Sequence, residues 1–197
     1  MKIAVIGGIG CGKSEAMRAF GDNGYAVLSA DQINNELWQD ESYLGTLKLN
    51  FPEAVIEGEI TKASLSKVVF ADDEKRELLN SISHPLIVSK IVESKEELLA
   101  VELPLSLESG ILAEFDHVVL IDTKKSLRLK RLEGRGVDKK RAKRIMAVQP
   151  PMKALRRQAD VIILNNGTKE ALYEKASMVA DILNRQPLKS QNKHFKV

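Results

Sequence analysis

The sequence predicts an α/β protein built on a parallel sheet, and two observations lead to this prediction. Short apolar runs of strand length are closed by turn residues or acids: Ile3–Ile6, Tyr25–Leu28, Leu98–Leu103, Val118–Ile121 and Val161–Leu164. The segments between them carry apolar residues at spacings of three and four, which is typical of helices. Strands that alternate with helices in this way indicate a parallel sheet covered on both faces. Ligands of such sheets bind beyond the carboxyl ends of the strands.

The helices are expected in a definite order along the chain. The first apolar run leads through glycines into a helix from about Lys13 to Asp22, and Asn23-Gly24 marks the turn into the second run. A long, mostly helical region of residues 31–97 follows, with its clearest break at Asn50-Phe51-Pro52. The last predicted helix, about Lys169–Asn184, has apolar residues at helical spacing and should pack one face on the sheet.

Composition and length limit the class of protein. A chain of 197 residues with 44% hydrophobic and 29% charged residues suits one folded domain, or one domain with a small insertion, and this composition excludes a disordered protein. Its uncharged apolar stretches are shorter than the roughly 20 residues of a membrane span. Cys11 is the one cysteine, so an internal disulfide is excluded. We therefore expect a cytoplasmic protein, with a polar, basic and mobile tail at residues 186–197.

Positive charge gathers in one segment. Lys124–Arg157 holds 14 Lys or Arg residues against Glu133 and Asp138, although the whole chain carries a net charge of only +3. A local field of one sign indicates a polyanionic partner, and both nucleotide phosphates and nucleic acid qualify. The alternative is a solvated basic helix face with no binding role.

The glycines after the first run form a phosphate-binding motif. Gly7-Gly8-Ile9-Gly10-Cys11-Gly12-Lys13-Ser14 matches G-x-x-x-x-G-K-[ST] between a strand and a helix. Glycines let the backbone amides approach phosphate oxygens, Lys13 supplies a cation, and the Ser14 hydroxyl can bind Mg²⁺. The motif predicts that a nucleoside triphosphate binds, but not which reaction follows. Cys11 reads as a small residue that fits this P-loop (residues 7–14), and a redox role is the alternative hypothesis, because a helix N-terminus favours a thiolate.

Several charged residues are candidates for catalysis. Asp31 follows the second run and could act as a general base, hold Mg²⁺ through a water, or cap a helix. Glu102 and Asp122 each close an apolar run, and spacing cannot decide which of them binds a metal. Arg131, Arg135 and Arg144 lie where a mobile lid would bring guanidinium groups over the transferring phosphate, a task that suits their planar fork. His84-Pro85 could contact substrate or serve only in packing.

In these motifs and their order the sequence resembles the dephospho-CoA kinase family from Ile3 to about Leu183. The P-loop resembles the family's GGIGSGKS, and Asp31 matches the second acid of its D-A-D motif. Further along, the similarity is carried by His84-Pro85-Leu86-Ile87, Pro104-Leu105 with Glu108, Arg131 and Arg135, Gln149, Ala159-Asp160, and Asn165-Asn166-Gly167. The departures are Ser29 for the first acid of D-A-D, Glu15 for a threonine, and Leu164 for an acid.

The resemblance implies a P-loop NTPase fold in three α/β/α layers, with five parallel strands in the order 2-3-1-4-5. It places one kinase domain over residues 1–185: a core of 1–31, 98–122 and 159–185, a helical CoA-binding portion of about 32–97, and a lid of about 124–157. It implies transfer of the ATP γ-phosphate to the ribose 3′-hydroxyl of dephospho-CoA, with Mg²⁺ as cofactor. The partner is then a small molecule, without nucleic acid or membrane, and the protein a monomer or weak homo-oligomer.

The resemblance also implies site residues. Asp31, Lys13, Arg131, Arg135 and Arg144 would be catalytic, and Ser14 would bind the metal. ATP would bind to Gly8, Gly10, Cys11, Gly12, Lys13, Ser14, Glu15, Asn165 and Gly167, and the acceptor to Asp31, His84, Pro104, Leu105 and Glu108. Two alternatives stay open: a P-loop kinase of another small acceptor, such as a nucleoside or nucleotide, and a nucleotide-gated RNA-binding module. The second predicts stacking aromatics, and 124–157 contains none.

Overall fold

The computed structural model describes residues 1–104, 108–185 and 195–196. The chain divides into two compact units. The first unit comprises Met1–Ser29 and Lys95–Val197, and the second comprises Ala30–Ser94. The predicted helical portion, residues 32–97, therefore covers most of the second unit, and the P-loop and the basic segment both belong to the first. Leu105 and most of the predicted tail, residues 186–194 and 197, lie outside the described residues.

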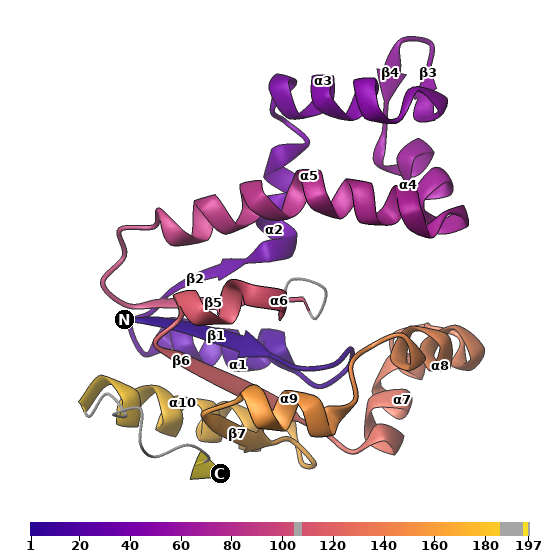
Figure 1. Cartoon of the computed structure of the whole chain (residues 1–197). Coiled ribbons are helices and arrows are strands. Elements are labelled where there is room, and N and C mark those ends of the chain that lie inside the picture. The colour runs from indigo at the N-terminus through magenta and orange to yellow at the C-terminus, as the bar shows by residue number, and fades with distance from the viewer. Residues whose placement is uncertain (105–107, 186–194, 197) are drawn as a thin grey trace. The chain divides into compact units, whose positions relative to one another are not determined.

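The first unit is built on one sheet, coloured along the chain in Figure 1. Its strands are β1 (Lys2–Ile6), β2 (Ala26–Ser29), β5 (Leu99–Glu102), β6 (His117–Asp122), β7 (Val161–Leu164) and β8 (Phe195–Lys196). They lie in the order β2-β5-β1-β6-β7-β8, and all the pairs are parallel. Without β8 this is the predicted five-stranded order 2-3-1-4-5, which is confirmed. The sixth strand, β8, was not predicted; it pairs Phe195 with Val161 at the edge of the sheet.

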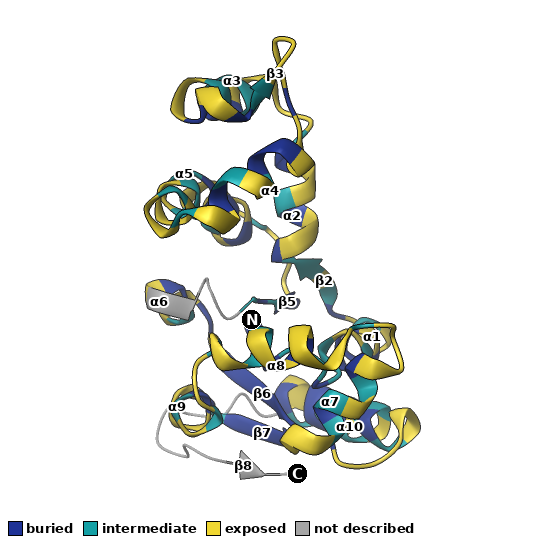
Figure 2. Cartoon of the chain, turned by 90° about the vertical axis from the view of Figure 1, so that its right-hand side faces the viewer, coloured by how far each residue is buried: buried dark blue, intermediate teal, exposed yellow. Residues whose placement is uncertain are grey.

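Helices cover both faces of this sheet, as Figure 2 shows end-on. One face carries α1 (Lys13–Asp22) and α10 (Lys169–Arg185), which pack on each other. The other carries α6 (Glu108–Ile111), a 3-10 turn (Leu112–Glu114) and α9 (Met152–Gln158). The segment before α9 forms α7 (Lys125–Glu133) and α8 (Lys139–Ala147). The three-layer prediction is therefore confirmed.

The core follows from the alternation of side chains along each strand. Ile3 and Val5 of β1, with Ile163 of β7, join one buried cluster together with Phe20 of α1 and Leu172 of α10. Ala4, Ile6 and Ile162, which alternate with them along the strands, are also buried, because the second helical layer covers the opposite face of the sheet. Burial of each large side chain stabilises the fold by roughly 1.5–3 kcal/mol. The strands are thereby fixed in register, and their carboxyl ends meet at one edge.

The second unit consists of helices and one short hairpin. Its elements are α2 (Ala30–Leu37), α3 (Glu41–Asn50), a 3-10 turn (Pro52–Ala54), β3 (Val55–Ile56), β4 (Glu59–Ile60), α4 (Lys62–Ala71) and α5 (Asp73–Val92). Asp40, Thr61 and Asp72 accept backbone hydrogen bonds as N-caps of α3, α4 and α5. The β3–β4 hairpin, which the sequence reading missed, turns at Glu57-Gly58 with φ of 51° and 81°.

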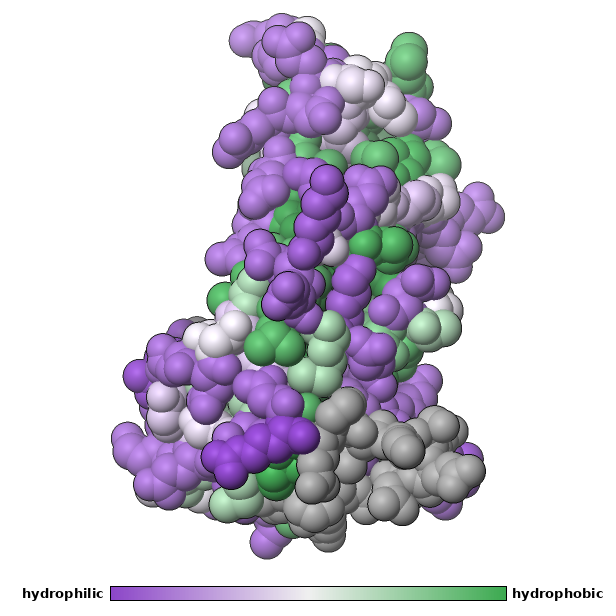
Figure 3. Space-filling view, turned by 90° about the vertical axis from the view of Figure 1, so that its left-hand side faces the viewer, coloured by the Kyte–Doolittle hydropathy of each residue, from purple (hydrophilic) through white to green (hydrophobic). Residues whose placement is uncertain are grey.

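The surface is largely polar on the face that Figure 3 shows, where hydrophobic side chains form separate small patches among hydrophilic ones. Large hydrophobic side chains that are exposed, such as Leu49 and Phe70, are scattered along the chain. Among the described residues, the structure contains no helix that is both long and apolar enough to span a membrane.

Candidate active site

The P-loop connects β1 to α1 through residues whose backbone only glycine adopts readily. Gly12, the residue before α1, has φ of +102°, in the left-handed region. A Cβ atom at this position would lie 2.6 Å from Nδ2 of Asn165, which is far too close. Glycine is therefore required at position 12 for two reasons: its left-handed backbone conformation and its close approach to Asn165, which follows β7.

The ends of two strands hold the loop from behind. The carbonyl oxygen of Cys11 accepts a hydrogen bond from Oγ1 of Thr123 at 3.1 Å and from Nδ2 of Asn165 at 2.7 Å. Thr123 follows β6 and Asn165 follows β7, and both are buried. Asn165 was predicted to bind nucleotide, whereas the anchoring role of Thr123 was missed. Within the loop, the amide of Cys11 also donates to the carbonyl of Gly8 at 3.1 Å, so the turn is held both from inside and from the strand ends.

Cys11, a residue of the loop itself, is fully buried. Burial raises the pKa of its thiol, and the nearby charge of Lys13 lowers it by less. The neutral thiol is therefore favoured. The raised pKa argues against the hypothesis that the helix N-terminus favours a reactive thiolate at Cys11, because desolvation outweighs the positive charges around it. A redox role of Cys11 stays a prediction.

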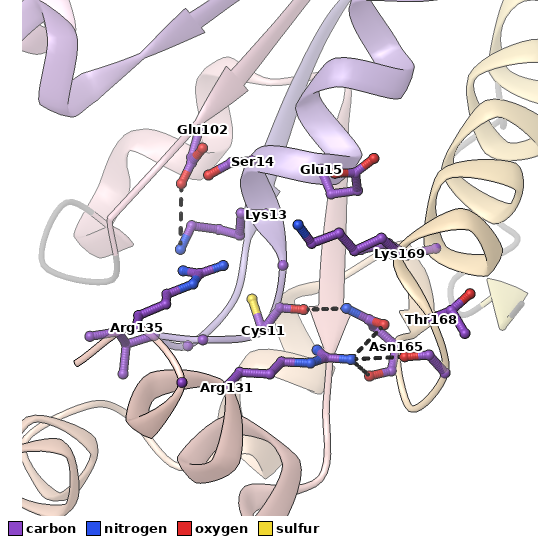
Figure 4. Close-up of a pocket in the computed structure, with 17 residues that line it drawn as sticks. Cys11, Lys13, Ser14, Glu15, Glu102, Arg131, Arg135, Asn165, Thr168 and Lys169 are labelled. Carbon is purple, nitrogen blue, oxygen red and sulfur yellow. Dashed lines mark hydrogen bonds and ion pairs between the residues drawn. The ribbon is translucent and has the colours of Figure 1, made fainter. Parts of the chain in front are cut away.

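A cavity of about 800 Å³ opens over the P-loop within the first unit (Figure 4). It is lined by Gly8, Ile9, Gly10, Cys11, Gly12, Lys13, Ser14, Glu15, Glu102, Arg131, Gly134, Arg135, Asn165, Gly167, Thr168, Lys169 and Leu172. All the residues predicted to bind ATP are among them. The cationic side chains outnumber the carboxylates, so the cavity suits a polyanion. Glu15, the departure from the family pattern, forms an ion pair with Arg18, which reduces its effect on this balance.

Lys13 and Glu102 face each other across this cavity. Nζ of Lys13 donates to the carbonyl of Gly7 at 3.0 Å and lies 3.7 Å from Oε1 of Glu102. Their side chains are 16% and 21% exposed, so the charges are partly desolvated while still reachable. Glu102 closes β5 and was one of two undecided acids, and the structure places it in the cavity.

Asp122, the other acid, lies elsewhere. Its Oδ2 accepts from Nε of Arg156 at 2.8 Å and lies 2.6 Å from Nη2 of the same guanidinium. Asp122 is 4% exposed and lines a second cavity, of about 390 Å³, behind α7. Its charge is therefore already neutralised by a helix of the outer layer.

The three lid arginines are placed differently. Nη2 of Arg131 donates to the side-chain and backbone oxygens of Asn165, at 3.1 and 3.3 Å, and to the carbonyl of Gly167 at 3.1 Å. Its Nη1 is buried and has no hydrogen-bond partner in the part of the chain that the structure describes. Arg135 lines the cavity, whereas Arg144 is exposed on α8 and does not. Their catalytic roles stay predictions.

The residues predicted for the acceptor are spread over both units. Asp31 is the second residue of α2 and His84 lies in α5, so both belong to the second unit. Pro104 follows β5, Glu108 is the first residue of α6, and Leu105 is not among the described residues. Partial burial lowers the pKa of His84, which favours its neutral form. The roles of these five residues stay predictions.

Among the cavity residues that the sequence did not indicate, two are polar. Thr168 directly follows Asn165-Asn166-Gly167, and Lys169 is the first residue of α10. The signal that could have found them is their position beyond the carboxyl end of β7, where ligands of parallel sheets bind. Lys169 adds a further cation to the cavity.

Together, the parallel sheet and the glycine loop with its lysine define the chain as a P-loop protein of the NTPase fold. Shikimate kinase from Acinetobacter baumannii shares this fold, with a TM-score of 0.57, 14% identity and coverage of 95% of each chain. The family model described as dephospho-CoA kinase matches residues 1–171. The chain therefore belongs to the dephospho-CoA kinase family.

Individual relatives agree with this assignment. The dephospho-CoA kinase of Corynebacterium glutamicum is 30% identical over 197 aligned residues, which cover 94% of this chain and 98% of the relative. A solved dephospho-CoA kinase from Campylobacter jejuni is 28% identical, with a TM-score of 0.71 and coverage of 94% of this chain and 98% of that one. The predicted family, and with it an ATP-dependent kinase that acts on a hydroxyl group, is confirmed.

Proposed function

We propose that this protein transfers the γ-phosphate of ATP to the ribose 3′-hydroxyl of dephospho-CoA, with ATP held in the cavity over the P-loop. The observation that carries the proposal is the pairing of Lys13 with Glu102 beside the P-loop, in a cavity that cationic side chains line. The triphosphate occupies the loop and contacts Lys13. Asn165, Gly167 and Arg131 line the cavity beyond the loop and contact the nucleoside.

Mg²⁺ fits the oxygen donors that line this cavity. The Ser14 hydroxyl and the Glu102 carboxylate would hold it, Glu102 through a water or directly. Among the described residues, no group of three or more His, Cys, Asp or Glu could hold a metal ion by itself. A kinase ion of this kind takes most of its ligands from phosphates and water, so one or two protein oxygens suffice. When bound, Mg²⁺ neutralises charge on the phosphates.

Asp31 acts as the general base on the acceptor. It comes two residues after Ser29, which pairs with Glu102 in the sheet, and it matches the second acid of the family's D-A-D motif. The 3′-hydroxyl oxygen attacks the γ-phosphorus, the bond from that phosphorus to the β–γ bridging oxygen breaks, and ADP leaves. Asp31 accepts the hydroxyl proton. Lys13 and Arg135 stabilise the charge that the transition state spreads over the phosphoryl oxygens.

The acceptor is tested by ADP release from ATP and Mg²⁺ with dephospho-CoA, nucleosides, nucleoside monophosphates or no acceptor. We expect stimulation by dephospho-CoA alone, and a product whose new phosphate is a 3′-monoester by phosphorus NMR. Stimulation by nucleosides or nucleotides instead would establish the alternative kinase. ADP release that no acceptor stimulates, together with RNA affinity that falls steeply with salt, would favour the RNA-binding alternative.

The base is tested by Asp31→Asn, with Asp73→Asn as the matched control. Asp73 lies in the second unit, forms an exposed ion pair with Arg76, and has no proposed role. We expect Asp31→Asn to lower kcat by about 100-fold or more while the Kd for ATP stays unchanged. Asp31 lies in the first turn of α2, so near wild-type turnover in this variant would mean that its carboxylate only stabilises that helix end. The cytoplasmic location and the oligomeric state stay predictions.

A further inference from the structure

The backbone of the P-loop is held at Ile9 by two side chains from outside the loop. The amide of Ile9 donates to Oε1 of Gln149 at 3.1 Å. The carbonyl of Ile9 accepts from Nε of Arg128 at 2.8 Å. Arg128 lies in α7, and Gln149 follows α8, so both come from the basic segment that the sequence marked as a lid. Both polar groups of one loop peptide residue are thus used by that segment.

The two side chains are also bound to each other. Nη2 of Arg128 donates to Oε1 of Gln149 at 2.9 Å, so this oxygen accepts two hydrogen bonds and closes a ring with Ile9. Each of the three residues contacts the other two. Loss of either side chain would leave a backbone group of Ile9 without its partner.

Arg128 is unusual for a charged residue. It is 8% exposed, and in the described part of the chain it forms no ion pair with a carboxylate. A buried charge without a counter-charge is costly unless hydrogen bonds satisfy it. Here the acceptors are a backbone carbonyl and an amide, both neutral. Asp122 attracts this positive charge from beyond ion-pair distance, so the guanidinium beside the P-loop relies on these neutral acceptors for its direct contacts.

Packing keeps this guanidinium against the loop. A Cβ atom at Gly8 would lie 2.2 Å from Nη2 of Arg128, so the guanidinium occupies the space that a side chain would need. The far end of an arginine can usually move aside, but this one is buried and bonded on both sides. Arg128 contacts Gly8 and Ile9 without lining the cavity over the P-loop.

We propose that Arg128 and Gln149 form a loop latch that holds the P-loop in its phosphate-binding form before ATP arrives. They are positioning residues, because they act on phosphate through the backbone of Ile9. A loop that is already ordered loses little conformational entropy on binding, and this raises affinity. The latch rests on the proposed binding of ATP at this loop, and not on the identity of the acceptor.

The proposal predicts a selective loss of ATP affinity. Without the latch, the loop must be ordered when ATP binds, whereas the bound complex retains its geometry. We expect the Kd for ATP to rise about tenfold in Gln149→Leu and in Arg128→Gln. We expect the KM for dephospho-CoA to stay within about twofold, because the latch does not act on the acceptor.

The experiment measures ATP binding by titration calorimetry, with no acceptor present. The variants are Gln149→Leu, Arg128→Gln and their double variant, each checked by thermal unfolding. The matched controls are Gln158→Leu and Arg157→Gln, which change exposed residues of α9 and should leave the Kd unchanged. Gln149 and Arg128 act as one unit. The Kd of the double variant for ATP should therefore be at most about twofold higher than that of the single variant with the higher Kd.

Two results would overturn the latch. One is an unchanged Kd for ATP in the folded Gln149→Leu variant, which tests the proposal even if Arg128→Gln does not fold. The other is a double variant whose loss equals the product of the single losses, which would mean that the two residues act independently. Failure of dephospho-CoA as acceptor would refute the proposed reaction and leave these binding results unaffected.

Discussion

Strands β5 and β6 lie on either side of β1. Both end in a carboxylate, but the two carboxylates have different partners. Each is a buried apolar run closed by a carboxylate, Glu102 in β5 and Asp122 in β6. Glu102 faces Lys13 in the cavity, while Asp122 is bound by Arg156 of α9. The difference lies in which cation reaches each carboxylate. An acid whose partner is a P-loop lysine is available to a ligand, and an acid whose partner is a structural arginine is not.

The strongest test of this comparison is Glu102→Gln. The amide keeps the shape of the side chain but loses the charge that faces Lys13 and the predicted Mg²⁺ donor. We expect kcat to fall by about 100-fold, a loss typical of one electrostatic contact to a phosphoryl transition state. Steady-state kinetics would measure it, with Asp122→Asn as the matched control. If both variants keep wild-type kcat, the distinction between the two strand ends has no catalytic meaning.

A second test asks whether the β6 side is chemically inert. Thr123 binds the carbonyl of Cys11 there, and burial raises the pKa of the Cys11 thiol. Because alkylation requires the thiolate, we expect the native protein to react with iodoacetamide at pH 7.5 about tenfold or more slowly than the denatured protein. Mass spectrometry after timed quenching would measure the rates. Equal rates would show that the loop anchors open freely.

A third test measures what Asp122 contributes to stability. Asp122→Asn removes the charge that a half-exposed Arg156 neutralises, so solvent screens part of the loss. We expect the free energy of unfolding to fall by about 1 kcal/mol and Tm by roughly 2–4 °C. Calorimetry would measure both, and kcat should stay near wild type. If Asp122→Asn lowered kcat but not stability, Asp122 would have a catalytic role and not the structural one assigned to it here.

The smallest effect that we expect is on the pH dependence of stability. It comes from His84 in the second unit, which contains neither Glu102 nor Asp122. Burial lowers the pKa of His84 below its ordinary value of 6.5. The unfolded chain therefore binds this proton at higher pH than the folded chain does, and stability falls as the pH drops through 6.5. Chemical unfolding at pH 7.5 and 5.5 should show this loss in the wild type and a smaller loss in His84→Gln. An identical loss in both would assign the pH dependence to other groups, including the carboxylates of the first unit.

The sequence predicted the features that depend on local patterns. The P-loop, the five central strands and the helices on both faces follow from residue types close together in the chain. The choice between Glu102 and Asp122 does not, because the arginine that neutralises Asp122 is 34 residues away and Lys13 comes from another strand end. Only the folded chain brings these partners together.

Other features were missed for similar reasons. The contacts of Ile9 with Arg128 and Gln149 join residues 119 and 140 positions apart, beyond any local pattern. Strand β8 has two residues, too few to show a periodicity. The β3–β4 hairpin has equally short strands, although Glu57-Gly58 is a turn sequence that a closer reading could have recognised.

The contact between Gly8 and Arg128 restricts how this chain can change over time. A glycine in a phosphate loop is usually explained by the space that the ligand needs. At Gly8 the space for a side chain is also taken by the guanidinium of Arg128. A mutation that adds even a methyl group at position 8 would be tolerated only in a background where residue 128 had already become shorter. The two sites are therefore expected to substitute in a fixed historical order, with the helix position changing first.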